Sequence, residues 1–417
     1  MALRLVFLLL LLPIVAQSFA VLPSAASSSL LSVSSSARSL TSPAYFRPQH
    51  LPLAPRSPLS MSPTVLSAAS SSTLELPGTA KLDKPWTDLG FEFRPTRSHL
   101  RMTYKEGQGW GPMELVKEPY LKIHIAATAL HYGQACFEGL KAFAHADNSV
   151  HLFRPLDNAA RIAASCARVM MPEVPPELFV EACKTVVRDN MAYVPPYGSN
   201  GALYLRPVLF GSGPRIGLQP ADEYTFLIMA IPVGDYYKGG LAPVPAVVIS
   251  DFDRAAPRGV GGVKVAGNYA ADLLPNMLGK KMGYPIGLYL DSKTRSFIEE
   301  FSTSNFVGFK DNGKTLVTPK SDSVLPSITN KSLMQLARDE GMKVEQREVP
   351  VTELAEFEEV VACGTAVVVT PVGKILVGDK VYNYGSDVGK TTMKLYNRVR
   401  GIQNGVQEDK FGWNVKV

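Results

Sequence analysis

A chain of 417 residues is too long for one small core and predicts two or three domains. Its formal net charge of +6 is uneven, because residues 1–74 contain four arginines and no acidic residue. About +2 therefore remains on the rest of the chain, which argues against a nucleic-acid-binding surface. Four scattered cysteines form no CxxC motif, so the sequence indicates neither a disulfide framework nor a metal site.

The first 80 residues have the composition of targeting sequence. Residues 3–15 are almost wholly apolar, too short to span a membrane comfortably, and end before Ala16-Gln17-Ser18, which fits signal-peptidase cleavage. The following residues are rich in Ser, Ala and Pro. We expect a signal peptide over residues 1–18 and a disordered transit peptide over residues 19–80, as in algae with secondary plastids. The expected location is the plastid, with the mitochondrion as the alternative, and no membrane association after the leader is removed.

Residues 81–233 predict a small N-terminal α/β domain. Strands are expected near residues 88–93, 100–104 and 151–153, and a helix capped by Asp157 or Asn158 follows the last of these. Arg161 then lies in the first turns of this helix, where an arginine suits a phosphate group. An exposed ion pair is the alternative for Arg161.

Residues 201–211 alternate as a strand and place Tyr204 and Arg206 on one face. An arginine with apolar neighbours needs an anion, which could be a ligand or another side chain. An apolar strand over residues 224–233 ends at a Gly- and Pro-rich stretch. We therefore predict a linker over residues 234–243 and a large C-terminal domain over residues 244–417.

The stretch Gly259–Tyr269 contains one lysine, Lys264, among four glycines, with no acidic residue within five positions. Glycine lets a backbone approach a ligand closely, and a desolvated lysine has a lowered pKa that makes its amine a nucleophile. A glycine-rich loop whose lysine reaches solvent is the alternative.

Three further stretches suggest a binding site. Glu299 and Glu300 are adjacent on a predicted strand, so only one can point inward. A Ser- and Thr-rich segment at residues 325–332 precedes a helix expected over residues 333–340. This segment could bind a phosphate group, or Thr329 or Ser332 could simply cap the helix. A tight turn at residues 364–366 could present a hydroxyl and a backbone N–H.

A competing motif lies at Gly385–Thr391. It is similar to the phosphate-binding loop GxxxxGK[ST] but has one residue too few between its glycines. A helix is expected over residues 392–400. A nucleotide-binding regulatory protein is therefore kept as an alternative of a different functional class.

The segment Gly261–Tyr269 resembles the segment that carries the cofactor-binding lysine of the branched-chain aminotransferases. These are class IV aminotransferases, which use pyridoxal 5'-phosphate (PLP). Four other matches occur along the chain in the family's order. They are the segment Leu130–Phe143, Arg161 after Phe-Arg-Pro, Glu300 with Asn305, and Gly364-Thr-Ala. The resemblance implies a two-domain α/β (α+β) fold of fold-type IV, with the active site between the domains, and a homodimer.

The resemblance also assigns roles. Lys264 would bind PLP covalently and move the proton between the substrate and the cofactor. The implied cofactor contacts are Arg161, Tyr269, Glu300, Ile328, Thr329 and Thr365. Because the resemblance selects Glu300, we expect Glu299 to be the solvated one of the two adjacent acids. The implied substrate contacts are Phe137, Tyr204, Arg206, Thr303, Ala366 and, reaching into the partner subunit's site, Tyr132.

The implied reaction transfers the amino group of leucine, isoleucine or valine to 2-oxoglutarate. A D-amino-acid transaminase or an aminodeoxychorismate lyase of the same fold is the alternative. Val367 and Thr370 stand where some animal members carry a redox CxxC, so we expect no thiol regulation of that kind and an inert Cys363.

Overall fold

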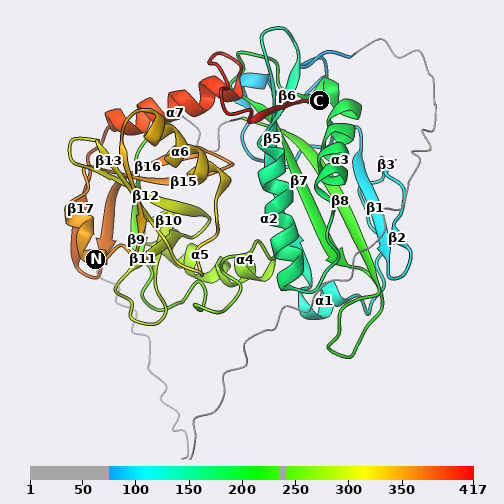
Figure 1. Cartoon of the computed structure of the whole chain (residues 1–417), viewed down its shortest axis with the longest axis horizontal. Coiled ribbons are helices and arrows are strands. Elements are labelled where there is room, and N and C mark those ends of the chain that lie inside the picture. Colours follow the sequence, from blue (N-terminus) through cyan, green and yellow to red (C-terminus); the bar gives the residue numbers. More distant parts are fainter. Residues whose placement is uncertain (1–74, 235–240) are drawn as a thin grey trace, which may run out of the picture. The chain divides into compact units, whose positions relative to one another are not determined.

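The computed structural model describes residues 75–234 and 241–417 (Figure 1). The predicted signal peptide, most of the predicted transit peptide and the centre of the predicted linker lie outside the described residues. Residues 75–80 are part of the fold, because Gly78 N donates to Val194 O at 2.8 Å and Ala80 N donates to Ala192 O at 2.9 Å. The expectation of disorder up to residue 80 is therefore wrong for these last residues.

The first sheet has nine antiparallel strands in the order β18-β6-β5-β7-β8-β1-β2, with β3 on β1 and β4 on β7. The chain's last strand thus returns to the first sheet, a long-range pairing that the linear division into domains did not include. The strands are β1 (His99–Lys105), β2 (Gly109–Trp110), β3 (Glu114–Val116), β4 (Ala135–Phe137), β5 (Leu140–Ala144), β6 (Val150–Phe153), β7 (Ala202–Gly211), β8 (Glu223–Val233) and β18 (Asn414–Lys416).

Two long helices pack together beside this sheet, and α3 contacts β8 and β1. The helical elements here are η1 (Trp86–Asp88), α1 (Thr128–Tyr132), α2 (Pro155–Arg168), α3 (Pro176–Asp189) and η2 (Met191–Tyr193). The start of α2 differs from the prediction. Pro155 opens it, which suits a first helical position, and its cap is Arg154 with a left-handed φ of 53°. Asp157 lies inside the first turn and accepts from Arg154 Nε, so it does not cap the helix.

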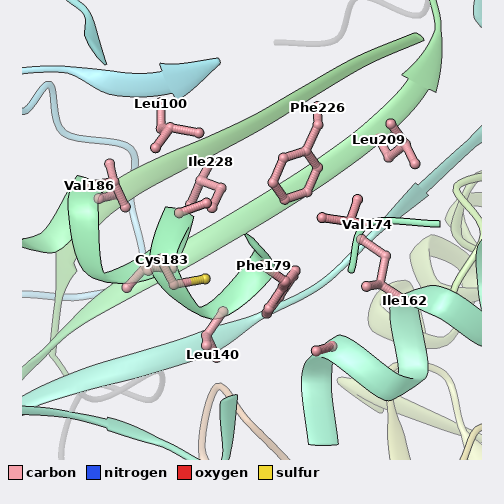
Figure 2. Packing of buried hydrophobic residues seen from close by; sticks show 14 of the residues in the cluster. Leu100, Leu140, Ile162, Val174, Phe179, Cys183, Val186, Leu209, Phe226 and Ile228 are labelled. Carbon is pink, nitrogen blue, oxygen red and sulfur yellow. The ribbon is translucent and has the colours of Figure 1, made fainter. Parts of the chain in front are cut away.

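The core of this half lies between the sheet and the helices (Figure 2). Along β8, buried and less buried residues alternate, as expected of a strand with one face on a core. Leucine, isoleucine and phenylalanine side chains from β1 and β8 meet side chains from α2 and α3. The fully buried members in Figure 2 include Leu100, Ile162, Phe179, Cys183, Val186, Leu209, Phe226 and Ile228.

The second sheet also has nine strands, in the order β11-β10-β9-β16-β15-β12-β13-β14, with β17 on β16. An additional pairing between β11 and β12 closes six of these strands into a barrel. Pairing is mixed, since β9 runs parallel to β10 and β16. The strands are β9 (Val244–Val248), β10 (Ile286–Leu290), β11 (Ile298–Phe301), β12 (Ser304–Lys310), β13 (Thr315–Pro319), β14 (Lys343–Arg347), β15 (Glu359–Gly364), β16 (Val368–Val377) and β17 (Lys380–Asn383).

The helical elements of this half are α4 (Gly267–Ala271), α5 (Leu273–Lys281), α6 (Ile328–Asp339), η3 (Val351–Ala355) and α7 (Lys390–Gln403). Helix α6 starts earlier than predicted, and its cap is Ser327, whose side chain accepts from Asn330 N. The predicted caps Thr329 and Ser332 lie inside the helix. In the described part of the chain, no helix is long and apolar enough to cross a membrane.

Candidate active site

A cavity of about 590 Å³ is lined by residues of both halves. They come from α2, β4 and β7 on the first side and from β10, β11, β15 and the Lys264 segment on the other. Ten of the predicted site residues line this cavity. They are Phe137, Arg161, Tyr204, Arg206, Lys264, Tyr269, Glu300, Thr303, Thr365 and Ala366.

The segment around Lys264 is fixed on both sides of its lysine. Phe137 N donates to Lys264 O at 3.1 Å, and Lys264 N donates to Ser165 Oγ on α2 at 2.9 Å. The preceding glycines serve another purpose than predicted. A Cβ on Gly261 would lie 2.3 Å from Ser323 O, and one on Gly262 would lie 2.6 Å from Asp322 O. These glycines therefore allow two chain segments to approach each other, rather than a ligand.

The amine of Lys264 donates to the hydroxyl of Tyr269 at 2.7 Å and lies 4.8 Å from the centroid of the Phe137 ring. Burial lowers the pKa of Lys264 to about 8, and the nearby Arg161 guanidinium lowers it in the same direction. Burial also raises the pKa of Tyr269 to about 12, so this tyrosine keeps its proton. A lysine with such a pKa has a substantial neutral fraction and can act as a nucleophile or base near neutral pH.

Glu300 on β11 is buried and fully hydrogen-bonded. It pairs with Arg254 at 2.7 Å and accepts from Leu325 N at 2.9 Å and from the Asn305 amide at 3.0 Å. Burial raises the pKa of Glu300 to about 7 despite the opposing charge of Arg254. The expectation that Glu299 is solvated is wrong, because it is buried and accepts from Ser321 Oγ at 2.9 Å and from Ser323 Oγ.

Arg161 has a partner that the sequence analysis missed. Its Nε and Nη2 donate to the two carboxylate oxygens of Glu138, each at 2.7 Å, and its Nη1 donates to Pro326 O at 3.2 Å. Burial opposes ionisation of Glu138, but the charge of Arg161 outweighs it and holds the pKa of Glu138 below its usual range. These bonds use three of the five guanidinium N–H groups, so Arg161 retains donors for an anion.

The other predicted phosphate contacts lie together next to the cavity. Ile328 and Thr329, at the start of α6, line a small adjoining pocket of about 20 Å³. Gly139 and Thr365 line both this pocket and the main cavity. The first N–H groups of a helix have no partner within it, so this corner offers backbone and hydroxyl donors to an anion.

The remaining polar pair lies on β7. Arg206 Nε and Nη2 donate to the Tyr204 hydroxyl at 3.1 and 3.0 Å, and the guanidinium lies 4.8 Å from the centroid of the Phe137 ring. The edge-to-face contact of Phe91 with Tyr204 adds a second aromatic wall. A Cβ on Gly139 would lie 2.3 Å from the Tyr204 hydroxyl, so only glycine fits beneath it.

Tyr132 is the predicted site residue that lies apart from the others. It is 43% exposed, does not line the cavity of its own chain, and its hydroxyl donates to Ile216 O. Its role in a partner's site stays a prediction.

Comparison with known proteins identifies the family. Residues 135–375 match the family model of the class IV aminotransferases. The chain is 47% identical over 343 residues to the branched-chain-amino-acid aminotransferase of Haemophilus influenzae. The aligned region covers 80% of this chain and 99% of that protein. The chain belongs to the branched-chain-amino-acid aminotransferases. The predicted family is thereby confirmed, and with it the assignment as a PLP-dependent transferase.

Two further relatives of this aminotransferase match it over most of its length. Branched-chain-amino-acid aminotransferase 3, chloroplastic, of Arabidopsis thaliana is 40% identical over 411 residues, 97% of this chain and 98% of the relative. The crystal structure of the Escherichia coli branched-chain amino acid aminotransferase superposes with a TM-score of 0.64 at 28% identity, covering 75% of this chain and 98% of that one. The predicted class IV fold is therefore confirmed.

The cavity of this aminotransferase fits the family's cofactor. It places an amine of lowered pKa, a carboxyl of raised pKa and a corner of backbone and hydroxyl donors around one space. These are the groups that would hold an aldehyde carbon, a pyridine nitrogen and a phosphate, respectively.

The structure removes the support for the nucleotide-binding alternative. Glu359 accepts from Thr391 N at 3.0 Å and from Thr392 N at 2.8 Å, so its carboxylate occupies the start of α7. A Cβ on Gly389 would lie 2.0 Å from Glu359 Cδ, which explains this glycine. A nucleotide phosphate at this place would meet a negative charge.

Cys363 is fully buried, and burial raises its pKa well above the usual range.

Sequence reasoning missed Arg254 and Glu138, which pair with two predicted site residues. Glu138 had a signal, because an acidic residue within Ala135–Leu140 has to find a partner once it is buried. Arg254 stands in a polar stretch ten positions before Lys264, and nothing in its neighbours marks it.

Proposed function

We propose that this aminotransferase transfers the amino group of leucine, isoleucine or valine to 2-oxoglutarate, with PLP as cofactor. The observation that carries the proposal is the Lys264 amine, whose pKa is about 8 and which lies in a cavity lined by apolar side chains and by Arg206. The branched-chain names of the relatives support the donor, and Arg206 supports a dicarboxylate acceptor.

When bound, PLP supplies an electron sink that weakens the Cα–H bond of the amino acid. Lys264 is placed to take the Cα proton as a base and to return a proton as an acid. Tyr269, which accepts the hydrogen bond of Lys264, is placed to orient the amine and to bind the cofactor's ring hydroxyl. Glu300 would hold a proton on the pyridine nitrogen through the negative charge of its carboxylate.

The phosphate would be held by the remaining donors of Arg161, by the backbone of Ile328 and Thr329, and by the Thr365 hydroxyl. This end of the site is distinct from the amine, so anchoring the phosphate orients the reactive carbon towards Lys264.

One pocket has to accept an aliphatic side chain and, in the other half-reaction, a carboxylate. The rings of Phe91 and Phe137, together with Val208, form the apolar wall. Arg206 and Tyr204 lie beside that wall and would bind the side-chain carboxylate of glutamate or 2-oxoglutarate. Thr303 and Ala366 also line the cavity and are proposed to contact the α-carboxylate.

The test is an absorbance titration of the purified protein with PLP, then leucine, then 2-oxoglutarate. The cofactor band should shift with leucine and return with 2-oxoglutarate, and Lys264→Ala should abolish both the band and the turnover. A band that ignores L-leucine but responds to a D-amino acid would reassign the substrate. Undiminished turnover by the Lys264→Ala protein would remove the catalytic assignment.

We propose a homodimer on the basis of an exposed apolar face on α5 and the residue that follows it. Leu273 is 72% exposed and Met282 63% exposed, with Leu274, Met277 and Leu278 beside them. Monomeric proteins rarely expose contiguous apolar patches of this kind. Light scattering of the eluting protein should give twice the chain mass, and Leu273→Asp should shift the mass towards the monomer.

We propose a plastid location, since the chloroplastic relative from Arabidopsis thaliana aligns over 97% of the chain and the leader has a targeting composition. A fluorescent protein fused behind residues 1–80 should enter plastids. Mitochondrial fluorescence would select the alternative.

A further inference from the structure

Lys141 is a buried lysine that the proposed reaction does not use. It lies on β5, opposite Tyr204 of β7, and is only 8% exposed. Lysine is almost never buried to this extent unless it has a partner, because desolvating its amine is costly. The contacts of Lys141 therefore indicate what the residue holds in place.

The amine of Lys141 donates to the backbone oxygen of Ala366 at 2.7 Å. The two residues are 225 positions apart, so this bond ties β5 of the first sheet to the turn between β15 and β16 of the second. That turn carries Thr365 and Ala366, the residues proposed to contact the phosphate and the substrate carboxylate.

The same turn ends in a conformation that needs support. Val368 has a φ of 65°, in the left-handed region that a β-branched residue rarely enters. Such a conformation persists only where surrounding contacts determine it. The bond from Lys141 to Ala366 is one such contact, two residues before Val368.

Lys141 also lines the small pocket of about 20 Å³ beside the cavity. Its other walls include Ile328, Thr329 and Thr365, the proposed phosphate contacts. A pocket of this size holds about one water molecule. Lys141 is therefore next to the phosphate corner as well as bonded to the turn.

We propose that Lys141 is a positioning residue that sets the Thr365–Ala366 turn at the distance required by the phosphate and the substrate carboxylate. This inference rests on the proposed function and deepens it. Loss of the amine lets the turn move, so cofactor and substrate bind more weakly, while Lys264 keeps its own contacts. The effect falls on the PLP dissociation constant and on KM more than on kcat.

The test compares Lys141→Met, which has no donor, and Lys141→Gln, whose amide donor ends one bond short of the position of the amine, with Lys141→Arg, which keeps a donor at full reach. PLP affinity is read from quenching of tryptophan fluorescence in the apoprotein, and KM and kcat are read with leucine and 2-oxoglutarate. For Lys141→Met we expect PLP affinity and kcat/KM to fall roughly tenfold to a hundredfold, with a smaller change in kcat. Lys141→Arg should recover much of the affinity.

Two control variants separate positioning from stability. Lys310→Met removes a partly buried lysine that pairs with Glu353 and Glu356, away from the cavity. It should lower the melting temperature but leave PLP affinity and KM unchanged. Lys374→Met, at an exposed position on β16, should change neither.

The outcomes are distinguishable. A wild-type protein that binds no PLP removes the proposed function itself. A wild-type protein that binds PLP, with Lys141→Met or Lys141→Gln behaving like Lys310→Met, overturns the role of Lys141 alone. If Lys141→Met does not fold, the milder Lys141→Gln decides, and unchanged PLP affinity in that variant contradicts the proposal.

Discussion

The pH dependence of Lys264 reactivity follows directly from its surroundings. An amine attacks an aldehyde only in its neutral form, which is present above its pKa and lost below it. The pKa of Lys264 lies at about 8 rather than at the ordinary lysine value of 10.5, because burial disfavours the charged ammonium and Arg161 repels it. A difference of about 2.5 units raises the neutral fraction at pH 7 by roughly 300-fold relative to an ordinary lysine.

The assay mixes the apoprotein with pyridoxal. Pyridoxal lacks the phosphate group of PLP, so the ionisation of a phosphate does not enter the measured rate. Borohydride traps the adduct, and mass spectrometry of peptides measures the initial rate of labelling at Lys264. The rate should rise about tenfold per pH unit up to a midpoint near pH 8. Labelling of the exposed Lys374 in the same samples serves as the internal reference for the amount of reagent.

The perturbation is Arg161→Met, which removes the charge that lowers the pKa of Lys264 most after burial, and leaves the buried Glu138 nearby. Both changes favour the ammonium form, so the midpoint for Lys264 should move upwards. Pyridoxal makes this comparison independent of any phosphate contact of Arg161. A wild-type midpoint for Lys264 of about 10.4, the value of an ordinary lysine, or a downward shift in the Arg161→Met protein, would refute the electrostatic reasoning.

Two further predictions concern Glu138 and Arg206. Glu138→Gln leaves Arg161 buried without its counter-charge and should lower the free energy of unfolding by about 3–5 kcal/mol, measured by denaturant titration. The exposed pair of Glu181 with Arg188 is the matched control, and Glu181→Gln should cost about 1 kcal/mol or less. Arg206→Met should raise KM for 2-oxoglutarate roughly tenfold to a hundredfold while sparing KM for leucine, and an equal rise for both would exclude a carboxylate-specific role.

The sequence predicted those site residues that can be recognised from their immediate neighbours along the chain. Lys264 stands out because its neighbours along the chain are glycines and small apolar residues, and it lies in the cavity as expected. The rule that adjacent strand residues face opposite sides separated Glu299 from Glu300, and only Glu300 lines the cavity. The burial of Glu299 could not be predicted, since its partners Ser321 and Ser323 come from a segment more than twenty positions away.

Long-range pairings account for the other differences. The return of β18 to β6 depends on the tertiary arrangement of the C-terminus, and no local pattern in residues 414–416 indicates it. The start of α6 at Ile328 was missed because the apolar spacing begins only at Leu333, whereas the capping residue Ser327 determines the first turn. Local periodicity thus located the element but misplaced its beginning.

The lowered pKa of Lys264 depends on how the neighbouring charges are paired. Two carboxylates lie near the amine, and either could hold it as an ammonium ion if it were unpaired. Glu138 is instead bound by Arg161 through two bonds, and Glu300 is bound by Arg254. Each pair is close to neutral as a unit, so burial remains the largest influence on Lys264. Arg161, which sequence analysis tied to a ligand, and Arg254, which it overlooked, therefore have a second effect: they weaken the stabilisation of the Lys264 ammonium form by the two carboxylates.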